Sequence, residues 1–345
     1  MPTATEALRV GIIGTGVMGR DHARLLSTQV SGARLVAVAD VNDEGTRALA
    51  AELDVPLVYH DGIDLIESGE VDAVIIASPD RFHAGAAISC IERGLPVLCE
   101  KPLAPTAAEA SDVVDAVRRN PGALATVGFM RRFDPGYAAM KERLQSGADG
   151  AVLMTHSVHR NVEAYPGDDS SATIMNSAVH EIDIVRWLTG SRIVEVMWTA
   201  GRASSLISER HDPQLVLLRD SDDVLHTIEL QMHAQYGYDV RCELVCERAS
   251  IELPAPPGLV GRLPLVVSSE LSRSTAYPRD WRPRFEEAYR LELSAWVRAS
   301  LVGALPDGAA TVQEAYQTTV IAEAVVESMK RGGWVRLAAV EGEED

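Results

Sequence analysis

The sequence predicts an α/β fold in two domains: a doubly wound parallel sheet over residues 1–127, then an α+β domain with a mostly antiparallel sheet over residues 128–345. Three observations support this. A chain of 345 residues is too long for one ordinary core. Short β-rich runs alternate with helical patterns up to about Gly128. Beyond that point successive strand-like runs are joined by short turns, which favours antiparallel pairing.

The first half has the pattern of buried strands joined by crossover helices. Continuous apolar runs are typical of strands that are covered on both faces. The strand-like runs are LRVGIIG, ARLVAVAD, VDAVIIAS, LPVLCEK and ALATVGF. Segments such as GRDHARLLS and AAISCIERG lie between them and have helical patterns. We therefore expect a parallel sheet with crossover helices.

The second half begins with a helix near DPGYAAMKERLQSG, followed by strand-like and helical runs. The strand-like runs are AVLMTHSVHRN, IVEVMWTA, QLVLLRD, VLHTIELQMHA and YDVRCELVCE. The helix MNSAVHEIDIVRWL lies among them, and we expect RFEEAYRLELSAWVRASL and TVQEAYQTTVIAEAVVESMK to close this domain. The stretch LPAPPGLVGRLPL is rich in Pro and Gly, which indicates an exposed loop or edge.

Composition excludes several classes of protein. The net charge is −18 without a basic stripe, so we expect no nucleic-acid partner. No run reaches the roughly 18 apolar residues of a membrane span, and the N-terminal stretch has no apolar signal region, so we expect a cytoplasmic protein. Cysteines 90, 99, 242 and 246 form no CxxC pair and are expected to be reduced and buried.

A glycine motif opens the first domain. In VGIIGTGVMGRDHARLL, Gly14, Gly16 and Gly19 follow a buried strand and begin a helix. These positions give the tight turn, the close approach to a pyrophosphate and the close helix packing that a dinucleotide site needs. The phosphates would then meet the N–H groups at the helix N-terminus.

Asp40 ends the second strand-like run and is the expected ribose-binding acid. A carboxylate there accepts hydrogen bonds from the ribose hydroxyls and repels a 2′-phosphate, and the following residues include no Arg. The sequence therefore favours NAD over NADP. A solvated turn residue is the alternative reading of Asp40.

The segment CEKPLAP places Glu100 and Lys101 after the fifth strand-like run. Ligands bind at the carboxyl ends of strands in open α/β sheets, so we expect Lys101 to be functional rather than an ordinary surface cation.

These motifs resemble those of the Gfo/Idh/MocA oxidoreductases, and the resemblance runs nearly end to end. It rests on GIIGTGVMGRDHARLL, VADVN, EKPLA, GFMRRFDPGY, HRN and HEIDIVRWL, of which GFMRRFDPGY and HEIDIVRWL look most like inositol 2-dehydrogenases. The resemblance implies a Rossmann domain, a second domain with a large open sheet used for oligomerisation, usually to a tetramer, and a substrate pocket between the two domains.

The resemblance also implies roles for individual residues. Lys101 would assist at the reacting hydroxyl and His180 would be the acid/base, which suits the proton that a secondary alcohol must lose on oxidation. The residues expected to line a polyol pocket are Met130, Arg131, His159, Asp183 and Tyr236, with Tyr238 as the alternative tyrosine. Arg132 is either functional or part of a solvated pair. The expected cofactor-binding residues are Gly14, Thr15, Gly16, Val17, Met18, Gly19, Asp40, Val41, Ser78, Pro79, His83, Glu100 and Lys101.

The helix at MNSAVHEIDIVRWL has a polar edge and an apolar face. Asn176, His180 and Asp183 share the edge at spacings of four and three, while Ile182 and Val185 give apolar cover. The family usually has Asp where this chain has Asn176, and an amide cannot take the charge of a carboxylate. We interpret Asn176 as a variant catalytic residue; the alternative is that it caps the following helix.

The sequence thus predicts an NAD-dependent dehydrogenase for a cyclic polyol such as myo-inositol or scyllo-inositol, or for a related sugar. Other readings are a dehydrogenase that makes a keto-cyclitol or keto-sugar in biosynthesis, and a non-catalytic NAD-sensing protein, which would not need Lys101 and His180. No metal is expected, because His156 and His159 would point to opposite faces of a strand.

Overall fold

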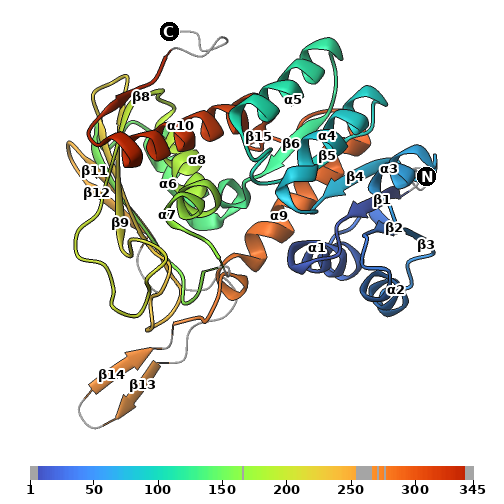
Figure 1. Cartoon of the computed structure of the whole chain (residues 1–345), viewed down its shortest axis with the longest axis horizontal. Coiled ribbons are helices and arrows are strands. Elements are labelled where there is room, and N and C mark those ends of the chain that lie inside the picture. The colour runs from blue at the N-terminus through green and yellow to red at the C-terminus, as the bar shows by residue number, and fades with distance from the viewer. Residues whose placement is uncertain (1–6, 165–166, 254–265, 270–271, 276, 339–345) are drawn as a thin grey trace. The chain divides into compact units, whose positions relative to one another are not determined.

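The computed structural model describes residues 7–164, 167–253, 266–269, 272–275 and 277–338 (Figure 1). The chain divides into two compact units. The first contains the chain up to Phe133 together with Ala288–Thr319, and the second contains Asp134–Glu287 together with the chain from Val320 onward. The first unit therefore extends slightly past residue 127, the boundary expected from the sequence, and includes a later segment.

The first unit is built on a seven-stranded sheet with the order β15-β6-β5-β4-β1-β2-β3. All pairs among β1 to β6 are parallel, and β15 pairs antiparallel with β6 at the edge. Strands β4 and β5 are buried along their whole length, which explains their continuous apolar sequences. The strands are β1 (Leu8–Ile13), β2 (Ala33–Ala39), β3 (Leu57–Tyr59), β4 (Ala73–Ile76), β5 (Val97–Glu100), β6 (Ala125–Gly128) and β15 (Ala310–Thr311).

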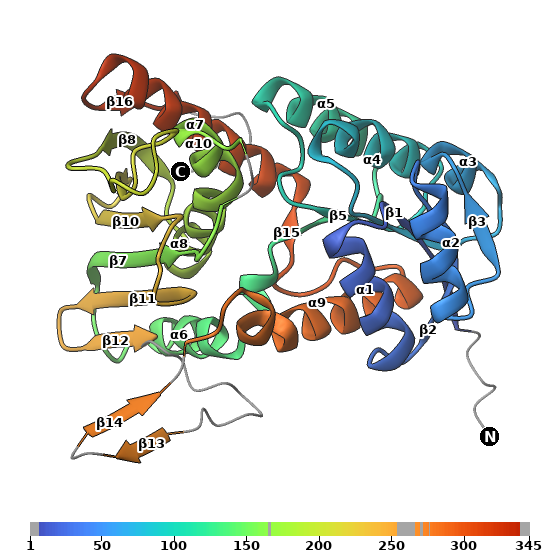
Figure 2. The same ribbon diagram turned by 60° about the horizontal axis from the view of Figure 1, so that its bottom comes forward.

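Helices cover both faces of this sheet, as expected for a doubly wound fold. In Figures 1 and 2, α1 lies on one face, and α4 and α5 lie side by side on the other. Local sequence fixes where these helices begin: Asn42 caps α2 through the Gly45 N–H, and Thr106 caps α5 through the Glu109 N–H. The helices are α1 (Val17–Thr28), α2 (Asp43–Glu52), α3 (Gly62–Glu67), the 3-10 helix η1 (Asp80–Phe82), α4 (His83–Glu92) and α5 (Ala107–Arg119). The strand order reverses between β1 and β4, and open α/β sheets bind their ligands at the carboxyl ends of strands at such a point.

The two long C-terminal helices, α9 (Arg282–Val302) and α10 (Val312–Arg331), form as the sequence predicts. They do not belong wholly to the second unit, because residues 288–319 are part of the first. Between the helices, Ala310 of β15 pairs with Val127 of β6. A helical pattern shows which face is apolar but not which core that face packs against. The sequence therefore does not reveal that residues 288–319 belong to the first unit.

The second unit also contains a seven-stranded sheet, with the order β12-β11-β7-β10-β9-β8-β16. Only β10 and β7 pair in parallel among these strands, so the prediction of a mostly antiparallel sheet is confirmed. The strands are β7 (Val152–Arg160), β8 (Ile193–Thr199), β9 (Gln214–Asp220), β10 (Leu225–Gln231), β11 (Asp239–Cys246), β12 (Ser250–Leu253) and β16 (Val335–Arg336). Strands β13 (Val266–Ser269) and β14 (Ser272–Thr275) form a separate hairpin. The Pro- and Gly-rich loop expected from the sequence lies outside the described residues from position 254 onward.

Residues along β7, β9, β10 and β11 alternate between buried and half-buried positions. Helices α6 (Pro135–Gln145) and α8 (Val179–Thr189) lie on the same face of the sheet in Figures 1 and 2. Before α8 come the short helix α7 (Ser170–Thr173) and the π-helical turn η3 (Ile174–Ala178). The alternation therefore produces one face towards these helices and one half-exposed face.

A polar network lies within the core of the second unit. His226 of β10 has its Nδ1 atom 2.9 Å from Thr155 Oγ1 and its Nε2 atom 3.2 Å from Asp220 Oδ2. All three side chains are buried. Asp220 also accepts the backbone N–H groups of Asp222 and Val224, so this network ties the β9–β10 turn to β7.

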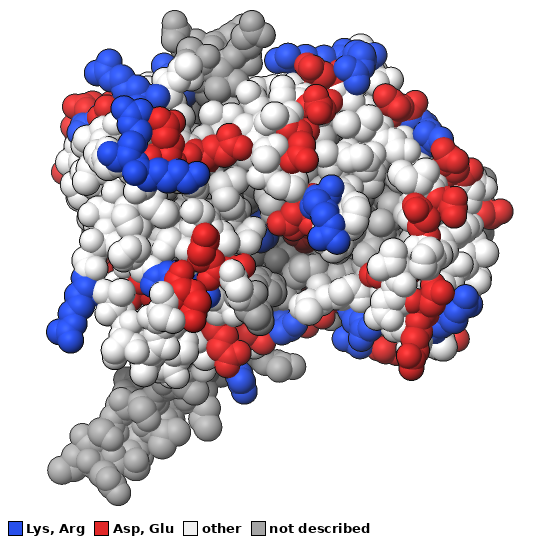
Figure 3. Space-filling model, in the orientation of Figure 1, with Lys and Arg blue, Asp and Glu red and all other residues white. Residues whose placement is uncertain are grey.

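The structure bears on several compositional expectations. All four cysteines are buried and free, and burial raises the pKa of Cys90 to about 12. None of the described helices combines the length and the apolar character needed to cross a bilayer. On the face drawn in Figure 3, Lys and Arg side chains are interspersed with Asp and Glu, in keeping with an acidic chain that has no basic stripe.

Candidate active site

The glycine-rich loop of the first unit has the geometry that its motif predicts. Gly14 has a φ of +94°, and a Cβ atom there would lie 2.4 Å from backbone atoms of Ala77 and Ser78 after β4. A Cβ atom on Gly19 would lie 1.8 Å from the Gly14 carbonyl oxygen, so only glycine allows α1 to pack this closely. A Cβ atom on Gly16 would meet no described atom beyond its chain neighbours within 4 Å. The loop is therefore open at Gly16 and tightly packed at the other two glycines.

This open side leads directly into α1. Gly16 is the N-cap residue, and because glycine has no side chain it cannot cap the first turn, where Val17 and Met18 lie. The N–H groups of that turn and the positive end of the helix dipole suit a pyrophosphate. The loop and helix thus fit the phosphates of a dinucleotide.

Asp40 follows β2, and the carboxylate is held by the loop. Its Oδ2 atom accepts the Thr15 N–H at 2.7 Å and lies 3.2 Å from Thr15 Oγ1, while Oδ1 accepts the Asn42 N–H at 2.9 Å. Thr15 is held in turn by the buried Thr46, with the two Oγ1 atoms 2.9 Å apart. The negative charge is therefore fixed beside the phosphate-binding loop, where it disfavours a 2′-phosphate.

Other residues expected at the cofactor lie beyond the carboxyl ends of β2 and β4. Val41, after β2, is 77% exposed. Ser78 and Pro79 follow β4 and lead to His83, which is buried. The two ring nitrogens of His83 each lie 2.7 Å from a carbonyl oxygen, that of Ser78 and that of Pro102. His83 therefore joins the segments after β4 and β5 rather than facing solvent.

Lys101 immediately follows β5 at this edge of the sheet. Its N–H donates to Oε2 of the buried Glu100 at 3.2 Å. After β6, the 3-10 helix η2 (Met130–Phe133) contains two expected pocket residues, Met130 and Arg131, both buried. The adjacent Arg132 forms an ion pair with Glu314 at 3.0 Å, which gives it a structural role within the first unit.

In the second unit, His180 lies in the first turn of α8 and is buried, with 8% of the residue exposed. The His159 ring from β7 lies 6.3 Å from the His180 ring, centroid to centroid. His159 Nδ1 is 3.0 Å from Oε2 of Glu181, and its Nε2 is 3.2 Å from Asn161 Oδ1. The structure thus brings two expected residues together and adds Glu181, which the sequence analysis did not identify.

Asn176 and Asp183 flank His180 along the chain. Asn176 lies in the π-helical turn η3, and Asp183 is fully buried within α8. π-Helical turns inside helices occur frequently at functional sites. The backbone is helical from α7 through η3 into α8, so Asn176 does not stand at a helix start and the structure does not support the alternative that it caps α8.

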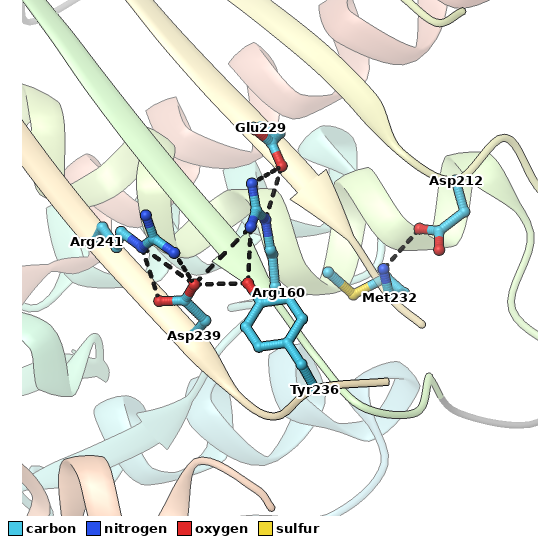
Figure 4. Close-up of polar contacts among 7 residues, drawn as sticks. All are labelled: Arg160, Asp212, Glu229, Met232, Tyr236, Asp239 and Arg241. Carbon is cyan, nitrogen blue, oxygen red and sulfur yellow. Dashed lines mark hydrogen bonds and ion pairs between the residues drawn. The ribbon is translucent and has the colours of Figure 1, made fainter. Parts of the chain in front are cut away.

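The two candidate tyrosines have different surroundings. Tyr238 is buried, and its ring lies edge-on to that of His159 with centroids 6.1 Å apart. Tyr236 is 47% exposed; its hydroxyl donates to Asp239 at 2.6 Å and accepts from Arg160 at 2.7 Å (Figure 4). The geometry therefore favours Tyr238 as the tyrosine beside His159.

A second group in Figure 4 supports the segment next to His159. Asp212 Oδ1 accepts the Met232 N–H at 2.6 Å. Burial raises the pKa of Asp212, although the Met232 hydrogen bond acts in the opposite direction. Met232 Sδ lies 3.5 Å from Asn161 Nδ2 and 3.4 Å from Ser177 Oγ, so Met232 connects the HRN motif to the π-helical turn.

The two histidines of β7 point to opposite faces, as their spacing predicts. His159 is on the helix-covered face, whereas His156 is half-buried on the other face, 2.9 Å from Thr227 Oγ1. Among the described residues, no three His, Cys, Asp or Glu side chains are grouped in a way that could hold a metal ion.

Comparison with known proteins identifies both parts of the chain. Residues 8–129 match the family model described as "Oxidoreductase family, NAD-binding Rossmann fold", and residues 137–252 match the GFO/IDH/MocA C-terminal domain. Inositol 2-dehydrogenase 2 of Paenarthrobacter aurescens is 44% identical over 331 residues, which cover 94% of this chain and 97% of that protein. The chain belongs to the Gfo/Idh/MocA oxidoreductase family.

Other members of the Gfo/Idh/MocA family are similar over almost the whole chain. Inositol 2-dehydrogenase 1 of Saccharopolyspora erythraea is 43% identical, with 94% of this chain and 95% of that protein covered. The myo-inositol dehydrogenase of Lactobacillus casei, solved with NAD(H) and myo-inositol, is 29% identical with a TM-score of 0.92 and covers 98% of each chain. The first domain of this oxidoreductase is accordingly an NAD-binding Rossmann domain.

Proposed function

We propose that this protein is an NAD-dependent dehydrogenase that oxidises a secondary hydroxyl of a cyclic polyol of the myo-inositol or scyllo-inositol type to the ketone. The observation that carries the proposal is the buried arrangement of His180, His159 and Glu181 in a chain 44% identical to an inositol 2-dehydrogenase. The relatives named for inositol cover almost the whole chain, so both domains are included in the comparison.

The proposed chemistry assigns one task to each side chain. When bound, NAD supplies the hydride acceptor. His180 takes the hydroxyl proton, because an imidazole can accept a proton near neutral pH. Lys101 assists, since an ammonium group favours the developing alkoxide.

Other side chains of the same motifs would hold the polyol. We propose that His159, Asp183, Arg131 and Met130 contact its hydroxyls and ring, and that Asn176 binds the reacting hydroxyl. An amide both donates and accepts a hydrogen bond, which suits a hydroxyl in either direction of transfer.

The test is turnover across a panel of cyclitols and aldoses, followed by NADH absorbance. We expect inositol isomers to be the best substrates, and Lys101→Ala and His180→Ala to lower kcat by about a hundredfold or more while NAD affinity stays nearly constant. A preference for an aldose would favour the related-sugar alternative, including a keto-sugar biosynthetic role. NAD binding without turnover on any member would favour the sensor alternative. Wild-type turnover by His180→Ala would remove this residue from the mechanism.

We also propose that the protein is a cytoplasmic homo-oligomer, a tetramer by analogy with its family. The half-exposed sheet face supports self-association because it carries apolar side chains, including Val158, Leu215, Leu217 and Leu225. The four free cysteines suit a reducing compartment. Light scattering coupled to gel filtration tests the assembly, and Leu217→Glu on this face should lower the measured mass.

A further inference from the structure

Glu100 and Lys101 stand next to each other, but their side chains have different surroundings. Glu100 ends β5 and is 4% exposed. A buried carboxylate is costly unless it is hydrogen-bonded, so the groups that hold it must compensate for the loss of water.

Two donors hold the two oxygens of Glu100 separately. Oε2 accepts the backbone N–H of Lys101 at 3.2 Å, and Oε1 lies 2.7 Å from Nε2 of His22. His22 lies on α1 and is fully buried, with its ring edge-on to that of Tyr289 and centroids 5.7 Å apart. Its Nδ1 atom has no hydrogen-bond partner among the described residues, so Glu100 is the polar group that fixes this ring.

Gly128 at the end of β6 closes the other side of the carboxylate. A Cβ atom on Gly128 would lie 3.2 Å from Glu100 Cδ and 3.3 Å from each carboxylate oxygen. These distances are shorter than ordinary van der Waals contact, so alanine at this position would require the Glu100 carboxylate to shift by a few tenths of an ångström. The carboxylate is therefore enclosed by α1, the start of the Lys101 segment and the end of β6.

We propose that His22 is a positioning residue for Lys101 and acts through Glu100. The connection runs from α1 through the His22 ring and the Glu100 carboxylate to the Lys101 backbone. Since α1 begins at the phosphate-binding loop, the same helix that receives the dinucleotide also fixes the segment that carries the proposed catalytic lysine.

The inference rests on the proposed role of Lys101. Removing the imidazole N–H leaves Oε1 buried without its donor, so the carboxylate is free to turn away and release the Lys101 N–H. A displacement of about 1 Å at a reacting group can lower the rate by about a hundredfold. The expected result is therefore a loss in kcat with a smaller fold change in NAD affinity. The melting temperature should also fall, because a buried carboxylate oxygen is left without its donor.

The experiment compares His22→Leu, His22→Gln and Gly128→Ala by kcat, NAD affinity and melting temperature on the best polyol. We expect His22→Leu to lower kcat by about ten- to a hundredfold. His22→Gln should restore most of this loss because glutamine keeps an N–H donor, and Gly128→Ala should resemble His22→Leu because it displaces the same carboxylate. Leu26→Ala is the matched control, since Leu26 is buried on the same helix and its apolar side chain cannot hydrogen-bond Glu100. It should lower the melting temperature and leave kcat unchanged.

A double-mutant cycle separates positioning from general destabilisation. In a Lys101→Ala background, His22→Leu should change kcat by less than about twofold, because the group that it positions has been removed. An equal fold loss in both backgrounds, or unchanged kcat in His22→Leu, would overturn the inference while leaving the role of Lys101 intact. Wild-type turnover by Lys101→Ala itself would instead remove that role, and the inference with it.

Discussion

His159 Nδ1 and Glu181 Oε2 lie 3.0 Å apart, and both side chains are buried in the second unit. The carboxylate accepts a hydrogen bond from the ring, so this contact favours the tautomer that carries hydrogen on Nδ1. His159 Nε2 lies 3.2 Å from Asn161 Oδ1, and a ring that carries hydrogen on Nδ1 alone presents a lone pair there rather than a donor. Glu181 therefore controls which hydrogen bonds His159 can offer a substrate.

The first prediction tests this control. Glu181→Gln keeps the shape of the side chain but can present N–H to the ring, so it should lower kcat/KM for the best polyol by about tenfold. NAD affinity should not change, because Glu181 and the dinucleotide loop belong to different units. Glu252→Gln, on an exposed position of β12, is the matched control and should behave as wild type. Equal kcat/KM in the two variants would contradict the role of Glu181.

The second prediction concerns the cofactor. Asp40→Ala removes the carboxylate that we expect to bind the ribose and loosens Thr15, so the preference for NAD over NADP should fall by about tenfold or more. Loss of a charged hydrogen bond costs about 1.5–3 kcal/mol, which supports a change of that size. Titration calorimetry with both cofactors measures the preference. Equal affinity of the wild-type protein for NAD and NADP would show that Asp40 does not discriminate.

The sequence predicted the strands and long helices well, because buried parallel strands and alternating antiparallel strands have distinct patterns. It missed the short edge strand β3 and the return of residues 288–319 to the first unit. The sequence also indicated only part of the buried cluster around His159. Motifs located His159 and His180, but Glu181 lies beside His159 only because α8 packs on β7, and no local pattern encodes that contact.

The third prediction distinguishes the two tyrosines that sequence spacing left open. Tyr238→Leu removes the ring beside His159 and should lower kcat/KM by about tenfold. Tyr236→Phe removes a hydroxyl that joins Asp239 and Arg160. It should therefore lower the melting temperature or weaken assembly and leave KM nearly unchanged. Steady-state kinetics and melting temperatures of both variants measure the difference. A larger kinetic effect of Tyr236→Phe would place Tyr236 in the pocket instead.

The fourth prediction concerns the stability of the second unit. Burial raises the pKa of Asp220, but hydrogen bonds from His226 and the Val224 N–H outweigh it, and the net pKa is lowered. A carboxyl group with a lowered folded-state pKa stabilises the fold above its unfolded value of about 3.9, and this contribution is lost as pH falls through that value and then the folded one. Asp220→Asn should therefore lower the free energy of unfolding by about 1–3 kcal/mol at neutral pH. Urea unfolding should show the gap to wild type shrinking below about pH 4, and a constant gap would contradict the assignment.

The last prediction concerns Asn176, where this chain differs from the usual aspartate of its family. Asn176 lies in the π-helical turn directly before α8, and the backbone stays helical through Ala178, so Asn176 is inside a continuous helical segment rather than at its start. Asn176→Asp adds a negative charge near the start of the helix that carries His180, which favours the protonated form of a nearby base. Oxidation requires the unprotonated base, so the acid limb of kcat/KM should move to higher pH.

The same substitution should alter discrimination among inositol isomers, because a carboxylate only accepts hydrogen bonds, whereas an amide also donates them. Asn176→Ala is the comparison variant: it removes the amide without adding charge, so it should lower kcat/KM but leave the acid limb in place. The measurement is kcat/KM against pH for the wild type and both variants on two inositol isomers. Superimposable profiles and unchanged isomer preference in Asn176→Asp would assign Asn176 to the structure of the π-helical turn. A shifted limb in Asn176→Asp alone would show instead that this position lies close enough to the base for a charge there to act on it.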